Sequence, residues 1–424
     1  MKKTVLLLSL SLGMHCAAQE KIILVNEGMW QTDNGRLTYF EDGKIVSNEW
    51  FRDVNGTKLG DTPNDIIRIN DNLIAIALNW SNIVQFITPY GKAVAATEDV
   101  PNNRKLATDG QFVYATSYAH EVGINGTKQE FEKGYVAKID VESFQVVDAV
   151  EVGYEPEGIA FYEGHLFVAN SGGYAFQENH DYESTVSIID AETMQVVRTV
   201  DTEQINLYSK ISQSGQYLCI NSPGDYYTTD AATIIFDCQA ALDDMPDRDC
   251  FVSLPIASTS NCVDTYGNFY AVGSRYSYIT GEYEFNTCVI DPEEVFESDG
   301  SSGVKNDFPG TVKEDIAAMT MPYSIYVNPY TGYIYATDSG EYTGAGALYQ
   351  WSPEGEFIGK YKTYINPAHF LALDPKRDSD TMGIETVESS SESAPIYNLQ
   401  GMRVTNLLPG QIYIQNGKKF ISQN

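Results

Sequence analysis

Side chains able to do chemistry are few in this sequence, and their spacing matches no catalytic motif. There is no G-x-S-x-G nucleophile turn, no H-E-x-x-H zinc motif and no glycine-rich phosphate loop. His120, His165, His180 and His369 are too far apart to indicate a metal site by spacing. We therefore predict no catalytic residue, no metal site and no resident cofactor, and interpret the chain as non-enzymatic.

Carboxylates offer an alternative chemistry. Calcium takes carboxylate and carbonyl oxygens, and four acidic residues lie where a shared site is conceivable: Glu27, Asp65, Glu157 and Asp338. An ion held there would polarise a lactone or phosphoester, so a calcium-dependent, lactonase-like hydrolase is one alternative function. With 58 acidic against 27 basic residues, however, solvated carboxylates are the ordinary expectation.

Aromatic side chains are far more numerous than candidate catalytic residues, and they suit ligand binding. The chain has 29 Tyr, 18 Phe and 4 Trp, and many of them fall in long loops between apolar segments. Tyrosine combines a large apolar body with a polar tip, which suits a half-exposed recognition surface. We expect about half of these aromatic residues to pack as scaffold. The predicted ligand-binding set comprises Trp30, Trp80, Asn102, Arg104, Tyr118, His120, Tyr174, Phe176, Tyr226, Tyr227, Arg275, Tyr276, Tyr278, Tyr342 and His369.

A repeated strand must position these loops. Segments 111–117, 165–171, 216–222, 268–274 and 333–339 share a hydrophobic pattern that ends in serine and follows a glycine suited to a tight turn. Looser copies begin at 21 and 72, so seven strands recur at spacings of 39 to 65 residues. Such a period is typical of propeller repeats. The sequence predicts an all-β, seven-bladed β-propeller, with at most a short helix near 240–244.

The ends of the repeat region predict how the ring closes. The chain enters at a second strand, 21–28, and leaves with 366–373, which resembles the innermost strands at 101–108 and 156–161. The last blade would then join a C-terminal inner strand to N-terminal outer strands. Loops leaving second strands and loops entering first strands share one face of such a ring. These are the long, aromatic loops, so we expect the ligand there.

Residues 1–18 are typical of a signal peptide. Lys2 and Lys3 precede an apolar run, and small residues lie before Gln19. We predict an exported protein at the cell surface or outside the cell, with the periplasm as a further possibility. Lipidation of Cys16 is the alternative, which the bulky His15 disfavours. The net charge of −31 argues against nucleic acid as a partner, and no apolar run is long enough to cross a membrane.

Five cysteines follow the predicted leader, and an odd number allows at most two disulfide bonds. An exported protein permits them, and Cys238 with Cys250 could close a short loop. Cys219 and Cys288 fit better as small buried strand residues, and Cys262 is left open. No CxxC pair or Cys/His cluster has zinc spacing.

Composition changes after the predicted propeller, which spans residues 19–374. Residues 375–394 are a Ser/Glu-rich linker, and 395–424 alternate as a small β unit. The stretches "YNLQGMRV" and "NGKK" resemble the C-terminal sorting tails of exported Bacteroidetes proteins. The alternative is an ordinary strand pair docked on the propeller.

Three stretches carry a resemblance to a known family: "PEGIAFYEGHLFVANSGG" (156–173), "DVPNNRKLATDGQFVYATSYA" (99–119) and "YSIYVNPYTGYIYATDSGEYTGAGALYQWSPEG" (323–355). They resemble the YncE-like, YVTN-type propellers of Bacteroidetes, in particular the branch of the cobalamin-capturing surface protein BtuG. The resemblance implies capture of cobalamin or a related corrinoid for a TonB-dependent outer-membrane transporter. Because the matching residues belong to strands and turns, a glycan- or protein-binding scaffold stays open as an alternative.

Overall fold

The structure is a computed structural model in which two compact units are distinguished, Met1–Leu373 and Asp374–Asn424. It describes residues 20–119, 133–175, 180–277, 282–374, 396–398, 403–404, 407, 412–415 and 418–421, with only the backbone at 274–277, 282–284, 397–398, 403, 412, 418 and 420–421. The predicted signal peptide and linker lie outside the described residues.

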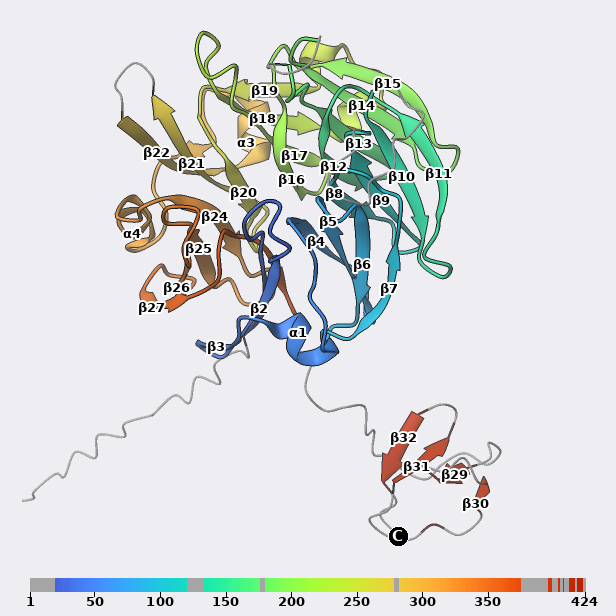
Figure 1. Cartoon of the computed structure of the whole chain (residues 1–424). Helices are drawn as coiled ribbons and strands as arrows, with labels where there is room; N and C mark the ends of the chain where they lie inside the picture. Colours follow the sequence, from blue (N-terminus) through green and yellow to red (C-terminus); the bar gives the residue numbers. More distant parts are fainter. Residues whose placement is uncertain are drawn as a thin grey trace, which may run out of the picture. The chain divides into compact units, whose positions relative to one another are not determined.

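Seven four-stranded antiparallel sheets of the first unit follow one another around a ring (Figure 1). Blade 1 consists of β4(Pro63–Asn70), β5(Leu73–Leu78), β6(Ile83–Ile87) and β7(Ala93–Thr97). Blade 2 consists of β8(Asn103–Thr108), β9(Phe112–Ser117), β10(Tyr135–Asp140) and β11(Val146–Glu151). Blade 3 consists of β12(Pro156–Tyr162), β13(His165–Asn170), β14(Thr185–Asp190) and β15(Gln195–Asp201). Blade 4 consists of β16(Tyr208–Ser214), β17(Tyr217–Ser222), β18(Ala232–Asp237) and β19(Phe251–Leu254). Blade 5 consists of β20(Ser260–Val263), β21(Phe269–Ser277), β22(Glu282–Ile290) and β23(Val304–Lys305). Blade 6 consists of β24(Pro322–Val327), β25(Ile334–Asp338), β26(Ala347–Trp351) and β27(Phe357–Lys362). The predicted seven-bladed β-propeller is confirmed.

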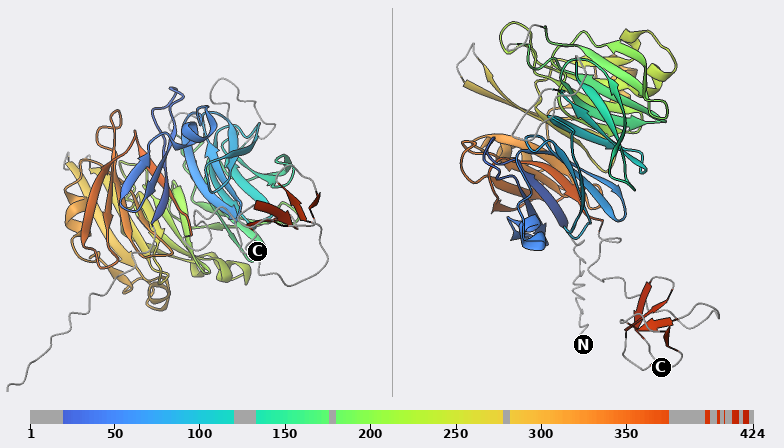
Figure 2. Two further views of the ribbon diagram at one scale, coloured as in Figure 1. Left: turned by 90° about the horizontal axis from the view of Figure 1, so that it is seen from below. Right: turned by 45° about the vertical axis from the view of Figure 1, so that its right-hand side comes forward.

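Blade 7 closes the ring by joining the two ends of the first unit. Its inner strand β28(Pro367–Ala372) pairs with β1(Lys21–Asn26), and β2(Arg36–Glu41) and β3(Lys44–Ser47) complete the sheet. Leu24 stands opposite Phe370, and Ile22 opposite Ala372. Blue segments from the start of the unit and orange-red segments from its end therefore lie side by side at the seam, as the turned views also show (Figure 2). The predicted exchange of terminal strands is confirmed.

The repeated pattern corresponds to the second strand of each blade. β5 and β1 are buried along their whole length, and β9, β13 and β17 are buried from the second residue on. A strand covered on both faces by neighbouring blades needs apolar residues at nearly every position, which makes it visible in the sequence. The preceding turns need glycine, since Gly110 and Gly267 have φ of 90° and 91°.

The serine that ends the repeat has a structural task. The hydroxyl of Ser117 donates to the carbonyl of Pro101 at 2.5 Å, and that of Ser171 donates to the carbonyl of Glu155 at 2.7 Å. Ser222 donates likewise to Ile205. Each acceptor lies in the segment leading into the first strand of the same blade. The serine thus ties the two chain segments that form the loop-bearing face.

The core consists of apolar clusters between neighbouring blades. Tyr114 of blade 2 packs with Leu166 of blade 3, and Leu24 of blade 7 packs with Tyr335 of blade 6. The rings of Tyr114 and Tyr335 are fully buried, so part of the tyrosine content is scaffold, as expected.

Helices in the described residues are short and lie between strands. They are α1(Trp50–Asn55), α2(Cys238–Leu242), η1(Asp247–Asp249), α3(Pro292–Glu297) and α4(Val312–Ala317). α2 is the helix expected near 240–244, whereas the expectation of at most one short helix is wrong, because α1, η1, α3 and α4 also form. No helix among the described residues is long and apolar enough to span a membrane.

All five cysteines of the described chain are buried free thiols. The burial predicted for Cys219 and Cys288 is confirmed, whereas the possible bond between Cys238 and Cys250 is not formed. A guanidinium N–H of Arg198 donates to the Cys250 sulfur at 3.7 Å, which gives this thiol a different partner.

The second unit contains a four-stranded antiparallel sheet in the order β30-β29-β31-β32. The strands are β29(Ile396–Asn398), β30(Arg403–Val404), β31(Ile412–Gln415) and β32(Lys418–Ile421). They are the alternating segments from which the small β unit was predicted.

Candidate ligand-binding site

The first strands of the blades surround a central channel that holds a cavity of about 640 Å³. β4, β8, β16, β20, β24 and β28 all contribute to its wall, together with Glu27 just beyond β1. Hydroxyl groups such as those of Ser212, Ser260 and Ser324 line part of the wall. Charged side chains form three groups that link different blades.

Arg104 is the centre of the first group. It lies on β8, and its guanidinium binds the carboxylate of Glu157 on β12 with N–O distances of 2.6 and 2.8 Å. Tyr118 donates to the same carboxylate oxygen, and the guanidinium stacks over its ring at 4.7 Å. Burial raises the pKa of Tyr118, so the phenol stays a donor. The guanidinium, 14% exposed, faces the cavity in a fixed orientation.

Lys210 and Asp65 form the second group. The ammonium of Lys210, on β16, is 2.6 Å from the carboxylate of Asp65, on β4. Burial alone would raise the pKa of Asp65, but Lys210 and the nearby Lys105 outweigh it and hold the pKa below its usual range. Lys105 donates to the backbone carbonyl of Asn64 at 2.8 Å. Burial lowers the pKa of Lys105.

The third group joins blades 6 and 7 through Glu27. Its carboxylate accepts a bond from the Tyr323 hydroxyl at 2.6 Å and contacts Nε2 of His369 at 3.0 Å. Burial and the charge of Lys105 lower the pKa of His369, so its imidazole is neutral at pH 7. Its Nε2 then carries the proton donated to Glu27, and its Nδ1 is a hydrogen-bond acceptor.

Aromatic residues stand on the segments that leave the second strands, on the face we call the mouth. Trp30, 63% exposed, packs edge-on against Trp80 with ring centres 4.8 Å apart. Tyr342 packs against Tyr323 at the cavity wall. Tyr227 is 73% exposed, on a turn whose backbone N–H groups donate to Asp225. The mouth therefore presents separate aromatic surfaces around the cavity.

The structure brings part of the predicted set together. Arg104, Tyr342 and His369 line the cavity. Asn102 and Tyr118 are buried and hold neighbours in place; Asn102 donates to the hydroxyl of Tyr174 at 3.4 Å. Trp30, Trp80, Tyr226 and Tyr227 lie on the mouth outside the cavity lining. His120, Phe176 and Tyr278, and the side chains of Arg275 and Tyr276, lie outside the described residues.

Sequence reasoning missed Lys105, Tyr208 and Lys210, which line the same cavity. All three lie on first strands, adjacent to residues with ordinary strand patterns. Aligning the first strands would have drawn attention to the two lysines, because Lys105 and Lys210 each occupy the third position of a first strand, as Asp65 does in β4.

The four carboxylates considered for calcium have other contacts. Glu27, Asp65 and Glu157 face His369, Lys210 and Arg104, as above. Asp338 accepts backbone N–H groups of Met321 and Gly340, both at 2.9 Å. Within the described residues, no three His, Cys, Asp or Glu side chains are grouped so that they could hold a metal ion. The calcium alternative stays an untested prediction.

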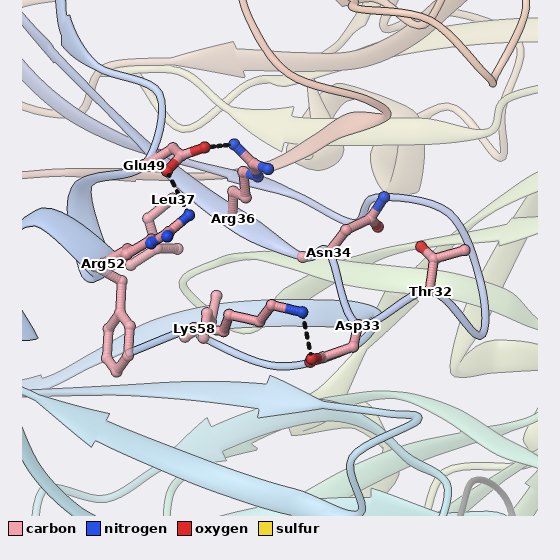
Figure 3. A pocket seen from close by; sticks show the side chains of 11 residues that line it. Thr32, Asp33, Asn34, Arg36, Leu37, Glu49, Arg52 and Lys58 are labelled. Atoms are coloured by element: carbon pink, nitrogen blue, oxygen red, sulfur yellow. Dashed lines mark hydrogen bonds and ion pairs between the residues drawn. The ribbon is translucent and has the colours of Figure 1, made fainter. Parts of the chain in front are cut away.

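A second, smaller hollow of about 110 Å³ lies beside α1 (Figure 3). Glu49 bridges Arg36 and Arg52, and Lys58 pairs with Asp33 at 2.8 Å. The Arg52 and Lys58 side chains are more than 60% exposed, so these pairs are solvated. We take the channel cavity, which is larger and holds buried polar groups, as the candidate site.

No family model matches the chain, and no curated protein matches it in sequence. Solved structures do match. Hydrazine synthase from Kuenenia stuttgartiensis aligns with a TM-score of 0.52 at 14% identity, over 74% of this chain and 93% of its own. A quinoprotein alcohol dehydrogenase-like protein from Bacteroides thetaiotaomicron aligns at 0.52 and 11%, over 83% and 77%. A functionally unknown protein from Desulfotomaculum acetoxidans aligns at 0.51 and 13%, over 84% and 99%. Likeness at these identities supports the propeller fold alone.

Proposed function

We propose that this protein is an exported, non-enzymatic propeller that captures a ligand at the mouth of its central channel. The observation that carries the proposal is the 640 Å³ cavity, walled by six first strands and surrounded by exposed aromatic side chains. A mostly preformed concave site with a few fixed polar groups is the usual form of a small-molecule site. Fixed ion pairs such as Arg104–Glu157 keep those groups oriented before a ligand arrives.

Cobalamin or a related corrinoid is the ligand we propose. The support is the sequence resemblance to YncE-like propellers and the breadth of the aromatic mouth. A whole corrinoid is larger than the cavity, so its ring would cover the mouth and only its side groups would enter the channel. Trp30 and Tyr227, the most exposed aromatic residues at the mouth, would then contact the ring face.

The biological setting follows from the same resemblance and from the leader sequence. We propose that the mature protein acts at the cell surface and passes its ligand to a TonB-dependent transporter. The predicted signal peptide supports export, and the sorting-like segment at 395–424 supports a surface location.

Titration of the purified mature chain with cyanocobalamin tests the proposal. We expect saturable binding that Trp30→Ala weakens by at least about tenfold, because an exposed Trp side chain that the ligand covers carries much of the binding energy. Tyr266→Ala is the matched control. Tyr266 is 89% exposed, but it lies on the turn between β20 and β21, on the face opposite the mouth. Absence of binding at micromolar ligand would remove the corrinoid from the proposal.

A protein-binding scaffold is the second candidate, and one observation favours it. Val147 of β11, Val197 of β15 and Phe357 of β27 expose about half of their surface on outer strands. A partner that contacts these strands would be recovered by crosslinking through cysteines placed at 147 and 197. Substituting mouth aromatics would leave such a complex intact, which separates the two candidates.

A further inference from the structure

We propose that the channel cavity selects uncharged amide groups of its ligand and rejects carboxylates. The inference rests on the proposed ligand-binding function, but it concerns the chemistry of the inner site and not the identity of the whole ligand.

The charges of the cavity balance one another. Arg104 is paired with Glu157 and Lys210 with Asp65, as described above, and both carboxylates are completely buried. Burial lowers the pKa of Lys105, and the charges of Glu157, Asp65 and Glu27 oppose that shift, while His369 is neutral at pH 7. The cations thus stand beside an equal number of carboxylates, within a chain whose net charge is −31. Among the described residues of the cavity wall, each cation therefore has a carboxylate nearby that offsets its attraction for an anion.

Hydrogen-bonding capacity does remain. The Nη1 group of Arg104 has no partner among the described residues, since Glu157 and Tyr208 take only Nε and Nη2. Lys210 uses two of its three N–H bonds, toward Asp65 and the carbonyl of Ile66. The hydroxyl proton of Tyr208 has no acceptor among the described residues, because the oxygen only accepts from Arg104. In the same cavity wall, Nδ1 of His369 is an acceptor.

An amide matches this inventory better than a carboxylate does. Its carbonyl accepts from Arg104, Lys210 or Tyr208, and its N–H₂ can donate to His369. A carboxylate would lose its hydration, would meet cations already neutralised by Glu157 and Asp65, and would offer His369 no donor. Discrimination between amides and carboxylates therefore comes from the buried carboxylates that repel an anion and from hydrogen bonds that a carboxylate leaves unmade, as well as from attraction to the amide.

The test compares succinamide with succinate by ligand-observed saturation-transfer NMR on the full mature chain. We expect a succinamide signal that weakens in the Arg104→Met/Glu157→Gln double variant, which removes the Arg104 donor without changing net charge. In the unaltered protein, the succinate signal should indicate binding weaker than that of succinamide by roughly tenfold or more. Equal or tighter binding of succinate overturns the inference, and so does absence of a site-dependent signal from both compounds.

A single charge change sharpens the test. In Glu157→Gln the side-chain oxygen Oε1 can still accept from Arg104 and Tyr118, while the new N–H₂ takes the place of Oε2, which has no hydrogen-bond partner. The fold should survive, which a melting curve checks, and Arg104 becomes an uncompensated cation. Preference should shift toward succinate. Glu49→Gln makes the same change in the partly buried Arg36 pair outside the cavity and should leave the preference unchanged.

The outcomes separate the two proposals. If cyanocobalamin fails to bind but succinamide is preferred over succinate, the corrinoid proposal falls and the amide selectivity stands. If cyanocobalamin binds but succinate is preferred in the unaltered protein, the selectivity falls and the ligand-binding function stands.

Discussion

The ammonium of Lys210 on blade 4 lies 2.6 Å from the carboxylate of Asp65 on blade 1, so one ion pair spans the central channel. The two residues are 145 positions apart in the chain, and their blades are separated by two others along the ring. Together with Arg104–Glu157, this pair turns the channel from an open passage into a cavity with charged, fixed walls.

Lys210→Met should destabilise the propeller by about 2–3 kcal/mol. Removing one partner of a buried pair typically costs about 3–5 kcal/mol, and here the 38% exposure of Lys210 and the presence of Lys105 reduce the loss. Lys58→Met, in the exposed pair with Asp33, should cost less than about 1 kcal/mol. Denaturant unfolding of both variants measures the difference. Equal losses would mean that the channel pair adds nothing beyond a surface contact.

Ring closure predicts a sharp boundary for truncation. A chain that ends after residue 374 retains β28 and its pairing with β1, and should melt cooperatively. A chain that ends after residue 366 lacks the inner strand of blade 7 and exposes the edge of β1, so its melting temperature should fall by tens of degrees or the transition should broaden. Similar melting of the two truncated chains would contradict the closure.

Stability should fall as pH drops below about 6.5, and His369 should account for the first part of the loss. The pKa of His369 is lowered in the folded protein, so unfolding takes up a proton in this range and the free energy of unfolding decreases toward lower pH. His369→Gln should flatten the decrease between pH 7 and 5. The control His165→Gln, at the start of β13, should keep the slope of the unaltered protein. The lowered pKa values of Glu27 and Asp65 predict a further loss below about pH 4.5.

Thiol titration checks the state of the cysteines. The five thiols of the mature chain should not react with Ellman's reagent in the native protein, because burial removes access and raises the pKa, to about 12 for Cys288. After unfolding without reductant all five should react. Recovery of three would reveal a disulfide bond, with Cys238 and Cys250 as the first pair to examine.

The fold was readable from the sequence because the second strands carry it locally. β5 and β1 are apolar along nearly their whole length. The five strict repeats follow a glycine turn, and three of them end in a serine that donates to a backbone carbonyl. These signals lie within about ten residues of one another. The terminal strand exchange followed from counting which strand of a blade came first.

The candidate site was only partly readable, because its contacts join distant parts of the chain. Lys210 acquires its role from Asp65, and Arg104 from Glu157, 53 residues away. Nothing in the segment around Lys210 distinguishes it from a solvated strand lysine. Asn102 and Tyr118 were expected at an open face, but their side chains are directed into the scaffold and position Tyr174 and Arg104.

The most direct test of the central claim is gel filtration of the purified mature chain after incubation with cyanocobalamin. The ligand is coloured, so its visible absorbance can be followed through the column. We predict that the colour elutes with the protein at a ratio near one ligand per chain, and that Trp30→Ala reduces it while Tyr266→Ala does not. Elution of all colour with the free ligand, at micromolar protein, would contradict corrinoid capture at the mouth of the channel.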